Sequence, residues 1–168
     1  MTAPPSRLPS ADPWRRLMGG VYEAVILFGV LWFADYAFSA LTQFRGHPGA
    51  LRTAFQWFTL AVLAVYFVGF WSSGRRSLPM KTMSLLLVSH DGGAVSPGRA
   101  LLRFAAATLL LVGALAAGRY LHGSLYALLL LPYAWTFVDR ERRALYDLIA
   151  GTRLVHAPVA PAMRSVDV

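Results

Sequence analysis

LMGGVYEAVILFGVLWFADYAFSAL, residues 17–41, decides the fold of this chain, because it is a long apolar run in which only Glu23 and Asp35 are charged. An α-helix needs about 20 such residues to cross the hydrocarbon core of a bilayer. Asp12 and Pro13 precede the run, and they suit the N-cap and the first position of a helix. We therefore predict that a membrane-spanning helix begins here.

Three further apolar runs, residues 54–71, 100–118 and 123–138, follow this one. Small residues dominate the middle of the 100–118 run, so we expect that helix to pack centrally, where backbones approach closely. The 123–138 run would be only about 24 Å long as a helix, against a core of about 30 Å. It also holds Pro132, which should bend it. Even so, the pattern predicts an all-α membrane protein with four transmembrane helices, spanning at about 17–41, 54–71, 100–118 and 123–138.

The basic residues lie on alternate sides of these runs. Of the 16 Lys and Arg residues, only Arg45, Arg52 and Arg119 lie in the first and third connections. The others lie in the N-terminal tail, the second connection and its flanks, and the C-terminal tail. Cytoplasmic loops are enriched in Lys and Arg in this way. We therefore predict a multi-pass protein of the bacterial cytoplasmic (inner) membrane with both termini in the cytoplasm (N-in/C-in).

The composition agrees with this class. The chain has 168 residues, of which 57% are hydrophobic and 14% charged, whereas soluble domains are about 25% charged. The net charge of +8 lies at helix ends, so we expect the partner to be a bilayer with anionic headgroups and not a nucleic acid. There is no cysteine, and the four histidines are scattered. We expect no metal site and no cofactor.

Two polar segments are predicted to form a small cytoplasmic β element. Residues 83–89 resemble a strand, and a His-Asp-Gly-Gly turn follows, after which residues 94–96 could return as another strand. Residues 152–156 form the second strand-like segment. A lone strand leaves its backbone groups unpaired, so we predict that these two segments pair with each other.

The remaining boundaries follow from short signals. A short helix before Gly151 has an apolar face, which predicts an interfacial helix lying flat on the membrane. We predict that residues 1–11 and 158–168 are disordered tails and that 12–157 form one transmembrane domain.

Ionisable groups inside a span cost about 2.5–3.5 kcal/mol each, so each needs a partner or a purpose. Glu23 needs a partner from another helix, and Arg103 lies at a compatible depth. The pair could be a structural ion pair, or Glu23 could be a proton or cation carboxylate. Asp35 faces elsewhere and is either a helix contact or a second ion ligand. Asp147 could pair with Arg143 or point inward to Arg16.

These residues carry a resemblance to the RDD family of small bacterial integral membrane proteins, named for one arginine and two aspartates. WRRLMGGVYEAVIL, residues 14–27, resembles the first motif, with Arg16 followed seven residues later by an acid. That acid is Glu23, where the family usually has aspartate. RALYDLIAGTRLV, residues 143–155, resembles the last motif, with Asp147 as the second family aspartate.

The middle of the chain carries the remaining motif. SLPMKTMSLLLV, residues 77–88, resembles a family segment that precedes a glycine turn and an arginine opening the next span, here Arg103. Pro79, Ser84 and Leu86 replace residues that the family usually has. The resemblance implies a multi-pass membrane protein, and ion or small-solute transport is proposed for some members.

Two functions stay open, and a third has little support. The first is ion or small-solute transport through a membrane carboxylate, with an ion or charge network of Arg16, Glu23, Arg103 and Asp147, and Asp35 as a secondary residue. One protomer is small for a transporter, so this reading implies a homo-oligomer. The alternative is a non-transporting accessory or assembly protein that docks on a larger membrane protein. We expect no enzyme and no catalytic residues, because no nucleophile motif or phosphate-binding loop is present.

Overall fold

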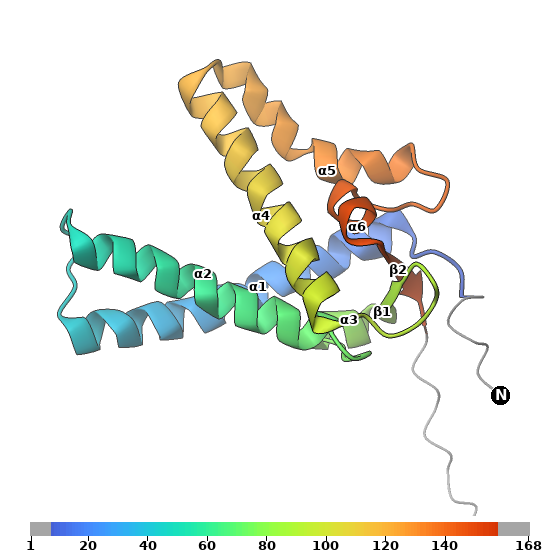
Figure 1. Ribbon diagram of the computed structural model, residues 1–168, viewed down its shortest axis with the longest axis horizontal. Helices are drawn as coiled ribbons and strands as arrows, with labels where there is room; N and C mark the ends of the chain where they lie inside the picture. Colours follow the sequence, from blue (N-terminus) through green and yellow to red (C-terminus); the bar gives the residue numbers. More distant parts are fainter. Residues whose placement is uncertain (1–7, 158–168) are drawn as a thin grey trace, which may run out of the picture.

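The computed structural model describes residues 8–157, which form a mostly helical fold with a small two-stranded sheet at one end (Figure 1). The elements follow in the order α1 (Pro13–Thr42), α2 (Ala50–Trp71), α3 (Leu78–Thr82), β1 (Leu85–Ser89), α4 (Pro97–Tyr120), η2 (Gly123–Leu129), α5 (Leu131–Ala134), η3 (Trp135–Phe137), α6 (Leu145–Ala150) and β2 (Thr152–His156).

Three helices of the described chain, α1, α2 and α4, are long and apolar enough to cross a membrane. The start of α1 is the predicted one: the Asp12 carboxylate accepts a hydrogen bond from the backbone N–H of Trp14, and Pro13 takes the first helical position. At the start of α4 the Ser96 hydroxyl caps the helix in the same way, accepting from the Arg99 N–H.

Helices α1 and α2 form an antiparallel hairpin. Polar contacts join them at two depths, one from Thr59 to Asp35 (2.8 Å) and one from Tyr66 to Glu23 (2.6 Å). Four phenylalanines pack around the turn between the helices: Phe38, Phe44, Phe55 and Phe58. None of the residues in the membrane-length windows of these two helices is buried within the described chain.

Residues 123–138 do not form the continuous spanning helix that the sequence predicts. They divide into η2, α5 and η3, and η2 runs back beside α4 before the chain bends (Figure 1). Gly118 of α4 and the Tyr126 ring pack so closely that a Cβ at Gly118 would lie 2.4 Å from that ring. Pro132 lies in the first turn of α5, and the whole run is too short for a straight crossing.

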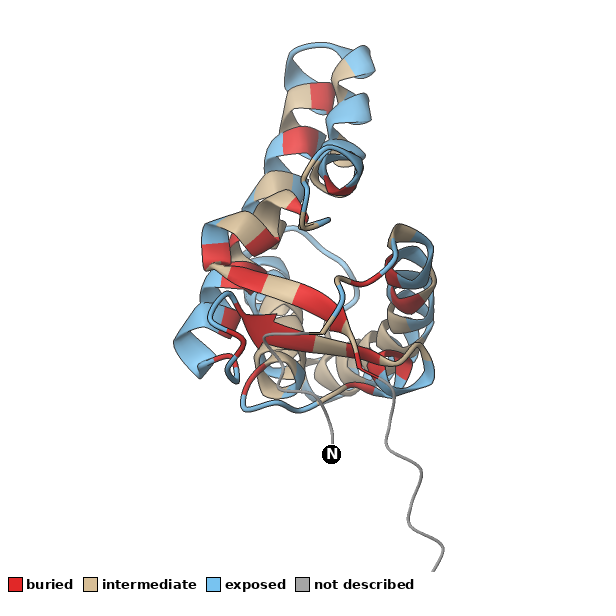
Figure 2. Ribbon diagram, turned by 90° about the vertical axis from the view of Figure 1, so that its right-hand side faces the viewer, coloured by how far each residue is buried: buried red, intermediate tan, exposed pale blue. Residues whose placement is uncertain are grey.

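The two predicted strands pair with each other, so this expectation is confirmed. Strands β1 and β2 are antiparallel, with Leu85 opposite His156 and Ser89 opposite Thr152. The predicted return strand at residues 94–96 is absent from this sheet, since that segment leads directly into α4. The sheet end of the molecule holds the main cluster of buried apolar side chains, whereas the long helices are largely exposed (Figure 2).

The N-terminal segment supplies a further backbone contact to the sheet. The N–H of His156 donates to the Pro9 carbonyl, and the Ala11 N–H donates to the Leu154 carbonyl. Ala11 is fully buried. The disordered tail predicted over residues 1–11 is therefore wrong for residues 8–11, because they satisfy the open edge of β2. The other residues predicted as tails, 1–7 and 158–168, lie outside the described residues.

Candidate functional site

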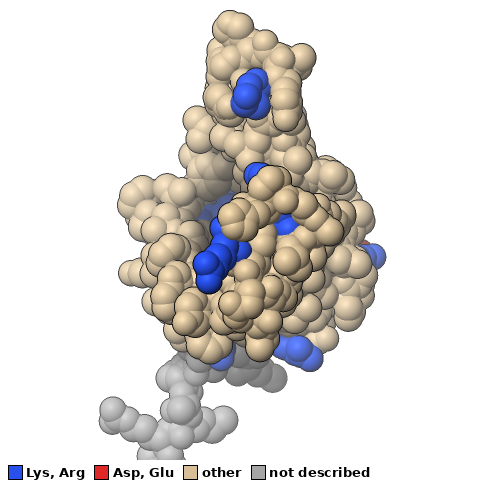
Figure 3. Space-filling view, turned by 90° about the vertical axis from the view of Figure 1, so that its left-hand side faces the viewer, with Lys and Arg blue, Asp and Glu red and all other residues tan. Residues whose placement is uncertain are grey.

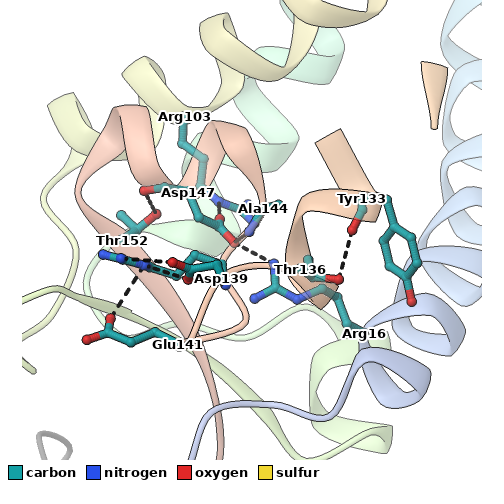
Figure 4. A network of polar contacts seen from close by, with 10 residues as sticks. Arg16, Arg103, Tyr133, Thr136, Asp139, Glu141, Ala144, Asp147 and Thr152 are labelled. Carbon is teal, nitrogen blue, oxygen red and sulfur yellow. Dashed lines mark hydrogen bonds and ion pairs between the residues drawn. The ribbon is translucent and has the colours of Figure 1, made fainter. Parts of the chain in front are cut away.

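The centre of the site is the Asp147 carboxylate, which is completely buried at the sheet end. It lies on α6, and its position follows from local sequence: Gly151 ends the helix in the left-handed conformation and turns the chain into β2. One oxygen of Asp147 accepts from Nη1 of Arg16 at 2.5 Å, and the other accepts from Nε of Arg103 at 2.7 Å. The carboxylate also accepts from the backbone N–H of Ala144 (Figure 4).

This cluster joins three elements that are far apart in the sequence. Arg16 comes from the first turn of α1, Arg103 from the first two turns of α4, and Asp147 from α6. The two arginine side chains are only 5% and 6% exposed. A lone buried charge costs several kcal/mol, whereas a paired and hydrogen-bonded one is tolerated. The cluster therefore fixes where α1, α4 and α6 meet.

The electrostatic environment keeps Asp147 ionised. Burial would raise the pKa of its carboxyl, but the charges and hydrogen bonds of Arg103 and Arg16 outweigh this effect, and the pKa lies below its ordinary value. Burial raises the pKa of the neighbouring Tyr146 hydroxyl, and the charge of Asp147 adds to the increase. Tyr146 therefore stays neutral.

Aromatic rings surround Arg103. Its guanidinium carbon lies 3.9 Å from the centre of the Trp71 ring and 4.9 Å from the centre of the Tyr146 ring. Cation–π contacts of this kind are worth most where water is excluded. Because Trp71 ends α2, the stack ties that helix to the cluster as well.

Arg143, one of the two residues considered as partners for Asp147, pairs elsewhere. It donates to Asp139 through Nε at 3.0 Å, and Glu141 lies nearby (Figure 4). The hydrogen bond from Arg143 holds the pKa of Asp139 below its ordinary value. Of the two alternatives, the inward contact to Arg16 is the one that Asp147 makes.

Glu23 lies outside the ion cluster. One of its oxygens accepts from the Tyr66 hydroxyl at 2.6 Å, and the other accepts from the Ser77 hydroxyl at 2.8 Å. Its partner does come from another helix, as expected, but the proposed pairing with Arg103 is wrong. Arg103 turns to Asp147 instead, and no ion pair of Glu23 occurs among residues 8–157.

Asp35 also makes a contact between helices. It accepts a hydrogen bond from Thr59 and lies partly buried between α1 and α2, away from the other four site residues. No group of three or more histidine, cysteine or carboxylate side chains in the described chain could hold a metal ion.

A cavity of about 350 Å³ connects the cluster to Glu23. Arg16, Arg103 and Tyr146 line one part of it, and Glu23 lines another. Apolar side chains of α2 and α4 form about half of the remaining wall. The cavity therefore brings three of the predicted site residues, Arg16, Glu23 and Arg103, to one place, while Asp147 lies behind the two arginines and does not line it.

The sequence reasoning did not identify Tyr66, Ser77, Trp71 or Tyr146 as site residues. Tyr66 could have been predicted as a partner of Glu23 from the helical hairpin. In two antiparallel helices, residues at similar distances from the turn lie at a similar depth in the membrane. Trp71 had no such signal, because a tryptophan at the end of a membrane helix is equally typical of an interfacial anchor.

The fold and this cluster define an integral membrane protein whose helices are joined by a buried arginine–aspartate–arginine group. A family model agrees with this class: residues 10–151 match the RDD family, so the chain belongs to that family. The match covers most of the chain, which confirms the predicted resemblance. Neither a curated protein nor a solved structure matches the chain.

Proposed function

We propose that this protein moves a small ion or solute across the bacterial cytoplasmic membrane, with Glu23 as the carboxylate that binds or titrates. The observation that carries the proposal is the cavity lined by Glu23, Arg16 and Arg103 together. A carboxylate inside a membrane helix is costly, and such groups mark ion and proton paths. Glu23 is partly exposed within this cavity, whereas Asp147 is sealed by its two arginines.

In this proposal the charged residues have different tasks. Asp147, Arg16 and Arg103 form a fixed structural joint, because each carboxylate oxygen of Asp147 has an arginine at hydrogen-bond distance. Glu23 is held by two hydroxyl donors, which can reorient when a proton or cation arrives. The proposal includes no catalytic step.

The orientation belongs to the same proposal. Both ends of the described chain lie beside the sheet (Figure 1), and most basic residues gather on this side in the sequence. We assign this side to the cytoplasm, on the reasoning that positive charge resists translocation. Figure 3 shows the molecule from the end opposite the sheet, where a few basic side chains and almost no acidic atoms are seen.

The test is flux into proteoliposomes that hold the purified protein, measured with a pH-sensitive dye under an imposed sodium or proton gradient. Glu23→Gln should abolish the flux, because the amide cannot exchange a proton or neutralise a cation. Asp35→Asn is the matched control, since Asp35 is the other carboxylate of α1 and contacts only the hairpin. Equal flux from the wild type and Glu23→Gln would refute the proposal.

A second candidate is an accessory protein that docks on a larger membrane protein or on its own copies. The observation in its favour is that the apolar windows of α1 and α2 bury none of their residues within this chain, while that of α4 buries 28%. Cross-linking in native membranes distinguishes the two partners: a product of twice the chain mass indicates self-association, and a heavier product indicates a different protein.

A further inference from the structure

The cavity has a polar end and an apolar end. Arg16, Arg103 and Tyr146 lie at the polar end, beside the sheet. The wall continues along α2 from Trp71 to Leu63 and along α4 from Arg103 to Leu111. Most of this part is apolar, with Glu23 and Thr108 as its polar residues. Eight helical residues cover about 12 Å, so the apolar part extends roughly two turns into the helix bundle.

The polar end has unused hydrogen-bond donors and an unmatched charge. Asp147 neutralises only one of the two guanidinium groups, Arg16 and Arg103. Within residues 8–157, Nε and Nη2 of Arg16 are buried and have no hydrogen-bond partner. The Tyr146 hydroxyl lies beside the Arg16 guanidinium and interacts with it both by charge and as a hydrogen-bond partner, but neither Nε nor Nη2 of Arg16 makes a hydrogen bond of full geometry. Buried donors of this kind normally have an acceptor.

The position of Glu23 limits what the acceptor can be. Glu23 lies seven residues after Arg16, about 10 Å along α1, and both of its oxygens already accept hydrogen bonds. An anion near Glu23 would be repelled, so an anionic group belongs at the arginine end. The wall beyond it favours an apolar chain.

We propose that this cavity binds an anionic phospholipid, with the phosphate at Arg16 and Arg103 and part of one acyl chain along α2 and α4. Basic pockets between membrane helices select acidic headgroups by charge. The phosphate supplies acceptors for the unpartnered nitrogens of Arg16, and the ring of Trp71 lies beside the bound chain. This inference rests on the proposed function only in placing the site at the same cavity, and it does not require that the protein move ions.

Gly20 and Gly29 provide a matched pair of variants. Both lie on α1, and a Cβ added at either one would meet no atom within 4 Å. Gly20 lines the cavity, while Gly29 does not. Gly20→Leu should therefore fill the cavity without changing any charge, and Gly29→Leu controls for the helix and the added side chain.

The experiment measures quenching of tryptophan fluorescence by bromine-labelled acyl chains, with the full chain in phosphatidylcholine vesicles at high salt. High salt screens loose attraction of acidic lipid to exposed charges, but has little effect on a buried contact. We expect labelled phosphatidylglycerol to quench at about one-tenth the mole fraction that labelled phosphatidylcholine requires, one charge-assisted contact being worth about tenfold. Trp71→Phe should remove this preference, because Trp71 is the one tryptophan of the five that lines the cavity, and the other four report the surrounding lipid.

The variants decide the outcome. Gly29→Leu should keep the preference for the acidic lipid and Gly20→Leu should lose it. Equal quenching by both lipids, or a preference that survives in Gly20→Leu, would overturn the inference. A preference for a labelled free fatty acid over phosphatidylglycerol would also overturn it, since the phosphate would then not be the recognised group. The flux measurement on Glu23→Gln tests the proposed transport function separately. Failure of the lipid-binding inference can therefore be distinguished from failure of the transport proposal.

Discussion

Replacing Asp147 by asparagine should destabilise the protein more than any other change of a single charge in the chain. Asparagine keeps the size of the side chain but removes the charge between Arg16 and Arg103. Both guanidinium groups are at least 94% buried, so neither can regain water. Breaking a buried pair from one side costs about 3–5 kcal/mol. This is a large part of a total stability of about 5–15 kcal/mol.

The assay is thermal unfolding in a mild detergent, followed by circular dichroism. A loss of 3–5 kcal/mol corresponds to a midpoint lower by about 6–20 °C for a chain of this size. The control is Asp91→Asn, because the Asp91 side chain is 76% exposed and its pairing with Arg99 is a surface contact. That change should move the midpoint by no more than about 3 °C.

The pH dependence provides an independent check. The pKa of Asp147 is lowered on folding, so its contribution to stability is complete above the unfolded pKa of about 3.9 and is lost as the pH falls through the folded pKa. The difference in midpoint between the wild type and Asp147→Asn should therefore be constant near neutral pH and shrink below about pH 4. If the variant unfolds within the error of the wild type at pH 7, the cluster does not hold the helices together.

Three further predictions concern the fold. Gly118→Leu should lower the unfolding midpoint, because its side chain would collide with the Tyr126 ring, while Gly113→Leu faces open space and should leave the midpoint unchanged in the same assay. Leu87→Ala should cost about 2–5 kcal/mol by denaturant titration, since this side chain is only 1% exposed; a loss under 1 kcal/mol would argue against the packed sheet. A phosphatase reporter inserted at His47 should be active, as expected for an external turn, and inactivity there would reverse the assigned orientation.

The sequence was sufficient for the parts of the fold that depend on local chemistry. Apolar length identified α1, α2 and α4, and Asp12-Pro13 identified the start of α1. The pairing of the two strands was also predictable, because neither strand could satisfy its backbone groups alone. Strand pairing needs only that two such segments lie on the same side of the membrane.

Residues 123–138 could not be predicted in the same way. Their apolar composition is equally typical of a membrane helix and of a segment that packs on one. The deciding contact is the approach of Tyr126 to Gly118, a tertiary contact that allows η2 to lie beside α4. Hydropathy measures the free energy of moving a side chain from water into an apolar environment. It has the same value whether that environment is lipid or a neighbouring helix.

The site shows the same limit for charges. The position of Glu23 in an apolar run correctly predicted that it needs a partner. The free-energy cost of burying a carboxylate does not determine whether that partner is an oppositely charged group or a neutral hydroxyl. Tyr66 and Ser77 satisfy Glu23 with neutral donors. Arg103 is thereby left for Asp147, which already has Arg16, and the result is one positive charge more than the cluster can neutralise. That surplus, facing a cavity with apolar walls, is the reason to look for an anion with an apolar tail.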